Sequence, residues 1–97
     1  MTAAVTELLA QLVEVTAPPP DGADPEAVLA AFDAMIATRA TLLHALEAAT
    51  PRAPTAAGLN LAEELARRDQ AWLAALGLAR HAVAERLVAV RRAQRRS

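Results

Sequence analysis

The stretch that decides the fold is LAEELARRDQAWLAALGLARHAVAERLVAVRRAQRR, residues 61–96. No proline interrupts it, and apolar residues recur along it at spacings of three, four or seven. This pattern is typical of one long amphipathic helix with heptad-like packing. The apolar positions are Leu61, Leu65, Trp72, Leu76, Ala79, Val83, Leu87 and Val90. Asn60 and Glu63 have the spacing of a capping box, so the sequence predicts a helix over about residues 58–95.

A first, shorter helix is predicted over about residues 2–15. Its apolar residues follow the three-and-four spacing of a helix face: Val5, Leu8, Leu9, Leu12 and Val15. The segment APPPDGAD, residues 17–24, then ends this helix, because its three prolines lack backbone donors and favour an extended path.

A second helix is predicted over about residues 25–49. Asp24 can cap free amides, Pro25 fits the first helical position, and Glu26 suits the positive end of a helix. Its apolar stripe is Leu29, Phe32, Ile36, Leu43 and Leu46. The prolines of TPRAPTAAG, residues 50–58, separate it from the long helix.

The composition fits one all-α domain over residues 1–97. Alanine and leucine supply most of the apolar content, and the only aromatic residues are Phe32 and Trp72, which we predict to be core anchors. The chain has no cysteine, which excludes disulfides, thiolate metal sites and catalysis by a thiol.

The three predicted helices differ greatly in length. At about 1.5 Å per residue they span roughly 20, 37 and 50–55 Å. The sequence therefore predicts a three-helix up-down-up bundle whose long C-terminal helix outruns its partners, with the core completed by dimerisation. Gly77, beside Ala74, Ala75 and Ala79, is expected to allow another helix to approach closely.

The uncovered part of the long helix is the predicted partner-binding surface. Its residues are Leu76, Val83, Leu87 and Val90, with Arg86 as a polar edge. The occupant would be either a second copy of the chain or a helix of another protein, because an amphipathic face buries its apolar side against another element.

Arg39 lies on the apolar stripe of the second helix, where an aliphatic residue is expected. In an antiparallel register with a turn near residue 55, it faces Asp69, and we predict an interhelical salt bridge. The alternative is an anion-binding arginine assisted by Arg67 and Arg68. No nucleophile–base set or phosphate-binding loop is present, so we expect no enzyme activity and no catalytic residue.

His44 with Glu47, and His81 with Glu85, each share one helix face. The same register places the two histidines about 24 Å apart along the bundle. Their order is also the reverse of the Glu-x-x-His motif of di-iron bundles. We therefore expect no metal site and no cofactor.

Charge is distributed unevenly along the chain. Residues 1–50 carry seven acids against one arginine, and residues 51–97 carry nine arginines against four acids. The C-terminal arginines favourably meet the negative end of the helix dipole, and we interpret them mainly as a solvated helix end. A partner-binding edge is the first alternative and nucleic-acid contact the second, although the pI of about 6.1 is low for a nucleic-acid binder.

The N-terminal segment MTAAVTELLAQLVEV lacks a basic leader and carries Glu7 and Glu14, unlike a signal peptide. No apolar run reaches the roughly 18–20 residues that a membrane span needs. We therefore expect a cytoplasmic protein without membrane contact.

The segments AVLAAFDAMIATRATLLHALEAA and LAEELARRDQAWLAALGLARHAVAERLVAVRRAQRR resemble flagellar export chaperones of the FliT and FlgN kind, over about residues 25–96. The matching positions are Arg39, Leu42, Leu43, Leu46, Leu65, Asp69, Gln70, Leu76, Arg80 and Leu87. The resemblance implies a protein that holds a helical segment of a secreted subunit on the third helix. The fourth helix that FliT-type proteins use for regulation has no counterpart here.

The leading hypothesis is therefore a non-enzymatic helical binding protein, and most specifically a secretion or flagellar export chaperone. Two alternatives stay open. One is a structural homodimeric bundle without a client, and the other is a small nucleic-acid-associated protein that uses the C-terminal arginines.

Overall fold

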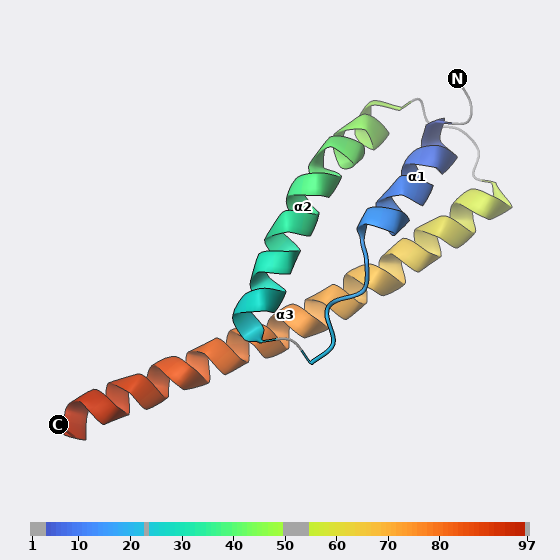
Figure 1. Ribbon diagram of the computed structural model, residues 1–97. Coiled ribbons are helices and arrows are strands. Elements are labelled where there is room, and N and C mark those ends of the chain that lie inside the picture. The colour runs from blue at the N-terminus through green and yellow to red at the C-terminus, as the bar shows by residue number, and fades with distance from the viewer. Residues whose placement is uncertain (1–3, 23, 50–54, 97) are drawn as a thin grey trace.

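The computed structural model describes residues 4–22, 24–49 and 55–96, and within these ranges it contains three helices and no strand. Helix α1 is Ala4–Val15, α2 is Pro25–Ala48 and α3 is Ala56–Arg96 (Figure 1). The all-α prediction and the long C-terminal helix are confirmed. The bounds differ from the predicted ones by at most two residues, and residues 2 and 3 of the first predicted helix lie outside the described ranges.

The helices run up, down and up. In Figure 1, α1 runs in the same direction as α3, and α2 runs against both. Each helix contacts the other two. At the first turn of α2, Asp24 and Glu26 pair with Arg86, while further along α2 Arg39 pairs with Asp69. The midpoint of every pair lies close to residue 55, which confirms the antiparallel register predicted from the sequence.

The capping hydrogen bonds predicted at the starts of α2 and α3 differ from those in the structure. Helix α3 begins at Ala56, and the Thr55 hydroxyl accepts a hydrogen bond from the Gly58 N–H at 3.0 Å. The capping box predicted at Asn60 is therefore wrong, because the helix is already a full turn long there. Asp24 makes no capping hydrogen bond either, since its carboxylate is held by Arg86 instead.

The core lies between α2 and α3. Its buried cluster comprises Val28, Met35, Trp72 and Ala79. Trp72 is only 4% exposed, and its ring packs at 5.8 Å from the half-buried ring of Phe32. The prediction that these two aromatic residues anchor the core is confirmed. From α1, Leu12 is fully buried.

The molecule is elongated because α3 extends beyond the bundle (Figure 1). Its principal extents are 66 × 21 × 17 Å, and its radius of gyration is 18.3 Å. A compact chain of this length would have a radius of about 12–13 Å. The last buried residue of α3 is Ala79, and every residue from 84 to 96 is exposed.

Gly77 does not mark a close helix contact. A Cβ atom built there would meet nothing within 4 Å, so the residue faces open space. The prediction of a close approach at Gly77 is wrong. Two small neighbours of Gly77 make the close contacts instead: Ala79 is buried, and Ala75 packs against the core cluster.

Helix α2 is long and apolar enough, by length and composition alone, to cross a membrane. The expectation that no segment reaches this length was therefore too strict. The same helix carries a buried, ion-paired Arg39 and buries Val28 and Met35. Core helices and signal sequences pass the same test of length and composition, and 17% of the apolar window of α2 is buried in the structure.

Candidate partner-binding site

Three polar contacts hold the helices together and so determine which part of α3 stays uncovered. The first is the ion pair of Arg39 and Asp69. A guanidinium nitrogen of Arg39 lies 2.8 Å from the Asp69 carboxylate, as the sequence predicted. Arg39 is 8% exposed, and its Nε atom has no hydrogen-bond partner among the described residues. A buried cation with one carboxylate partner sets the relative position of α2 and α3 along their length.

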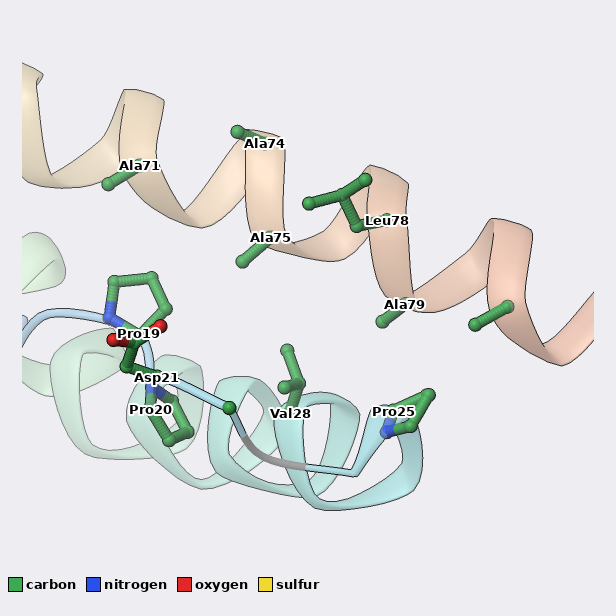
Figure 2. Close-up of a pocket in the computed structure, with 12 residues that line it drawn as sticks. Pro19, Pro20, Asp21, Pro25, Val28, Ala71, Ala74, Ala75, Leu78 and Ala79 are labelled. Carbon is green, nitrogen blue, oxygen red and sulfur yellow. The ribbon is translucent and has the colours of Figure 1, made fainter.

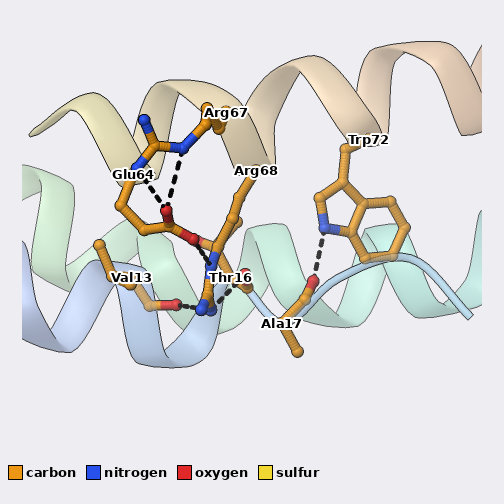
Figure 3. Close-up of polar contacts among 7 residues, drawn as sticks. All are labelled: Val13, Thr16, Ala17, Glu64, Arg67, Arg68 and Trp72. Atoms are coloured by element: carbon orange, nitrogen blue, oxygen red, sulfur yellow. Dashed lines mark hydrogen bonds and ion pairs between the residues drawn. The ribbon is translucent and has the colours of Figure 1, made fainter. Parts of the chain in front are cut away.

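The second contact is made by Arg68, which the sequence suggested only as an anion ligand. Its guanidinium donates hydrogen bonds to the backbone carbonyls of Val13 at 2.6 Å and Thr16 at 3.2 Å (Figure 3). These carbonyls lie at the C-terminal end of α1, where unsatisfied acceptors and the helix dipole attract a cation. Because α1 has no basic residue in its own last turn, the sequence could have indicated that an arginine from another helix binds there.

Glu64 and the Trp72 indole make further polar contacts beside Arg68. Glu64 accepts hydrogen bonds from Arg67 and Arg68, and hydrogen bonding to Arg67 first, then to Arg68, holds the pKa of Glu64 below its ordinary value. The Trp72 indole N–H donates to the Ala17 carbonyl at 2.8 Å (Figure 3). Arg67 and Arg68 are therefore engaged locally and do not join Arg39 in an anion site.

The third contact is made by Arg86, which is the last residue of α3 with an ion pair to the start of α2 among the described residues. It pairs with Asp24 at 2.8 Å and with Glu26 at 2.5 Å. Hydrogen bonding with Glu26, then with Arg86, lowers the pKa of Asp24, and hydrogen bonding with Asp24, then with Glu26, raises the pKa of Arg86. Arg86 therefore binds within the chain while its side chain stays 52% exposed, and its role at a partner stays a prediction.

We define the end stripe as Val83, Leu87 and Val90, three apolar residues of α3 on either side of Arg86. Val83 is half-buried, Leu87 is 49% exposed and Val90 is 52% exposed. Spacings of four and three residues place them on one helix face, which continues the buried face of Trp72 and Leu76. Leu76 itself is only 6% exposed, so its prediction as a partner-binding residue is wrong and it belongs to the core.

Four arginines lie on the last turns of α3: Arg91, Arg92, Arg95 and Arg96. All are exposed, and within the described ranges none forms an ion pair. No acidic residue follows Glu85. The uncovered end of α3 therefore combines an apolar stripe with a concentrated positive charge.

Two open grooves flank the contact between α2 and α3. The larger, about 640 Å³, lies between the proline-rich connection and the alanine-rich side of α3 (Figure 2). The smaller, about 280 Å³, lies on the other side around Phe32, Arg39 and Trp72, with the exposed Ile36 and Leu73 at its edge.

The histidines do not assemble a metal site in the part of the chain that the structure describes. His81 lies 3.6 Å from Glu85 on the same exposed helix face, and no group of three or more potential ligands occurs among the described residues. His44 is exposed on α2.

No family model, no curated protein and no solved structure matches this chain. The class of protein is defined by the fold and the site: an all-α three-helix bundle whose C-terminal helix extends beyond it.

Proposed function

We propose that this protein is a non-enzymatic binding protein that holds an amphipathic helix of another protein on the end stripe of α3. The observation that supports the proposal is the continuation of the core-facing stripe beyond the bundle, with Leu87 and Val90 about half exposed. Along the bundle, the same face of α3 is covered by a helix, and beyond it a helix from a partner would take that place.

The partner's chemistry follows from the residues around the end stripe. Apolar residues at helical spacing would pack against Val83, Leu87 and Val90, and burying the exposed half of Leu87 or Val90 contributes about 1 kcal/mol. The arginines that follow, Arg91 and Arg95 among them, favour a partner helix with acidic residues on its flanks.

The resemblance to flagellar export chaperones suggests a narrower class of partner. Under that proposal the protein acts in the cytoplasm, and its client is the helical end of a secreted subunit that is kept unassembled before export. The matching residues Leu76, Arg80 and Leu87 lie on the half of α3 that leads to the uncovered end.

The test is a pull-down from nuclease-treated lysate of the source organism with three baits: the wild-type protein, Leu87→Glu/Val90→Glu, and Leu73→Glu as a matched control. Leu73 is 61% exposed and lies about 21 Å before Leu87 along α3, so its substitution adds one of the two negative charges without touching the end stripe. We expect one helical protein to be retained by the wild type and the control and lost by the double variant.

A different set of results would reject the proposal. If the double variant retains every protein that the wild type retains, the end stripe binds no client. If only nucleic acid is bound by the wild type, in a strongly salt-dependent way, the C-terminal arginines and not the apolar stripe carry the function.

A further inference from the structure

The larger of the two grooves beside the α2–α3 contact is open and lined mainly by apolar residues. One wall is the side of α3 that carries Ala71, Ala75 and Leu78, and the other is formed by Pro19, Pro20 and the first turn of α2 (Figure 2). Leu78 is 73% exposed, the highest fraction among the large apolar side chains of the described residues. The groove exists because α1 ends at Val15 and the extended proline segment covers α3 less completely than a helix would.

The length of this groove matches the uncovered end of α3. The α3 residues that line it run from Ala71 to Ala82, which corresponds to about 16 Å of helix. Residues 87–96, the part of α3 beyond the Arg86 ion pairs, span about 14 Å. The chain thus contains both a groove and an exposed helix end of similar length.

Both features lie on one side of the same straight helix. Ala82, Ala89 and Ala93 follow Leu78 by 4, 11 and 15 residues, spacings that keep them near the same helix face. Alanines on both walls of a contact allow two helices to approach closely, and Leu78 can pack over a facing alanine.

We propose that a second copy of this chain fills the groove: two α3 helices pair antiparallel, and residues 87–96 of each copy lie in the alanine-lined groove of the other. The two-fold axis passes near residue 84, midway between the groove and the end of the helix. One contact then fills both grooves, which gives a closed, two-fold symmetric dimer.

Charge complementarity favours this occupant. The exposed carboxylate of Asp21 lies at the groove, and no basic side chain lines it. The inserted segment carries Arg92 and Arg96 on the groove-facing side and has no acidic residue. In the antiparallel register the partner's Arg96 comes opposite Ala71, at one end of the groove, and Asp21 lies in the groove's other wall.

This dimer contact is separate from the proposed client site. Val83 and Leu87 face the side of α3 that continues the core stripe, whereas Leu78, Ala82 and Ala89 face the groove, roughly two-fifths of a turn away. Dimerisation can therefore fail or hold independently of client binding.

The decisive experiment uses single cysteines, because the chain has none of its own. In the proposed register the partner's Ala89 lies opposite Leu78. Purified Leu78→Cys and Ala89→Cys proteins are mixed, oxidised, and compared on a non-reducing gel with each variant oxidised alone. The matched control mixes Leu78→Cys with Val88→Cys, because Val88 is exposed but lies about 100° around the helix from Ala89.

We expect a disulfide-linked species in the first mixture at a yield at least about tenfold above that of the control mixture and of each variant alone. Equal yields in all samples, or a higher yield with Val88→Cys, would overturn the proposal, because they would mean that this face of α3 is not the contact.

Light scattering during size-exclusion chromatography provides the second readout. The wild type is expected at about twice its chain mass of 10.2 kDa. Leu78→Arg is expected to raise the dimer dissociation constant at least about tenfold, equivalent to about 1.4 kcal/mol, with unchanged helical circular dichroism. A monomeric wild type at high micromolar concentration would overturn the proposal, as would a dimer that Leu78→Arg leaves intact.

Discussion

The Arg39 guanidinium on α2 lies 2.8 Å from the Asp69 carboxylate on α3, thirty residues further along the chain. Arg39 is almost fully buried, whereas Asp69 keeps about two-fifths of its side chain exposed. The pair therefore combines a desolvated cation with an anion that water still reaches, and it sets the register that leaves the end of α3 uncovered.

Removing the charge of Asp69 is expected to destabilise the bundle. Asp69→Asn leaves the buried Arg39 without its anion, which should lower the free energy of unfolding by about 1–3 kcal/mol in urea denaturation. The matched control is Arg67→Ala, which breaks an exposed pair with Glu64 and should change it by less than about 1 kcal/mol. Equal effects of the two variants would contradict the structural role of the buried pair.

Arg68 is expected to hold α1 and the proline segment against α3. Arg68→Met removes the hydrogen bonds to the carbonyls of Val13 and Thr16 and should lower the stability by about 1–3 kcal/mol. Hydrogen exchange should accelerate first in α1, and far less in α2. The neighbouring Arg67→Met variant bears no contact with α1 among the described hydrogen bonds and serves as its control.

Acid is expected to weaken the fold in a defined pH range. Asp24 and Glu64 have pKa values below their ordinary values of 3.8 and 4.5, because hydrogen bonds favour their charged forms. Their stabilising contribution is complete above about pH 5.5 and is lost as the pH falls through the lowered values. Urea midpoints measured from pH 7 to pH 2 should therefore be constant at first and fall below about pH 4.

Arg86→Met gives the matching test of that pH dependence. The variant removes one of the partners that lowers the pKa of Asp24, so its stability should depend less on acid than that of the wild type. An unchanged slope between pH 4 and pH 2 would mean that the ion pairs at Arg86 contribute nothing in solution.

Two leucines about three turns apart on α3 distinguish the core from the end stripe. Leu76→Ala removes a side chain that is 6% exposed and should cost about 2–5 kcal/mol. Leu87→Ala removes one that is 49% exposed and should cost less than about 1 kcal/mol in the isolated protein. Similar losses in thermal and urea denaturation would show that Leu87 is part of the folding core and not free for a partner.

Much of the fold could be predicted from the sequence because it depends on periodic patterns. Apolar spacing and proline breaks predicted three helices, and the antiparallel register with Arg39 opposite Asp69 followed from the turn predicted near residue 55. Start signals were less reliable: Thr55 and not Asn60 caps α3, because several residues at that start could cap and only the local backbone decides between them.

The site was predicted less well, because periodicity does not tell where a helix loses its cover. Leu76 and Val90 share one stripe, yet the first is buried and the second exposed, a difference set by the point where α2 begins. The intramolecular pairing of Arg86 and the binding of carbonyls by Arg68 depend on which side chains face each other in space. Neither follows from spacing along one helix.

Photo-crosslinking from the end stripe tests the central claim most directly. A photoreactive phenylalanine analogue is placed at position 87, and in a second strain at the exposed position 73, in cells of the source organism. We predict a covalent adduct between position 87 and one helical protein other than this chain, and none from position 73. Adducts from position 87 that contain only this protein, or the same adducts from both positions, would contradict the proposed client site.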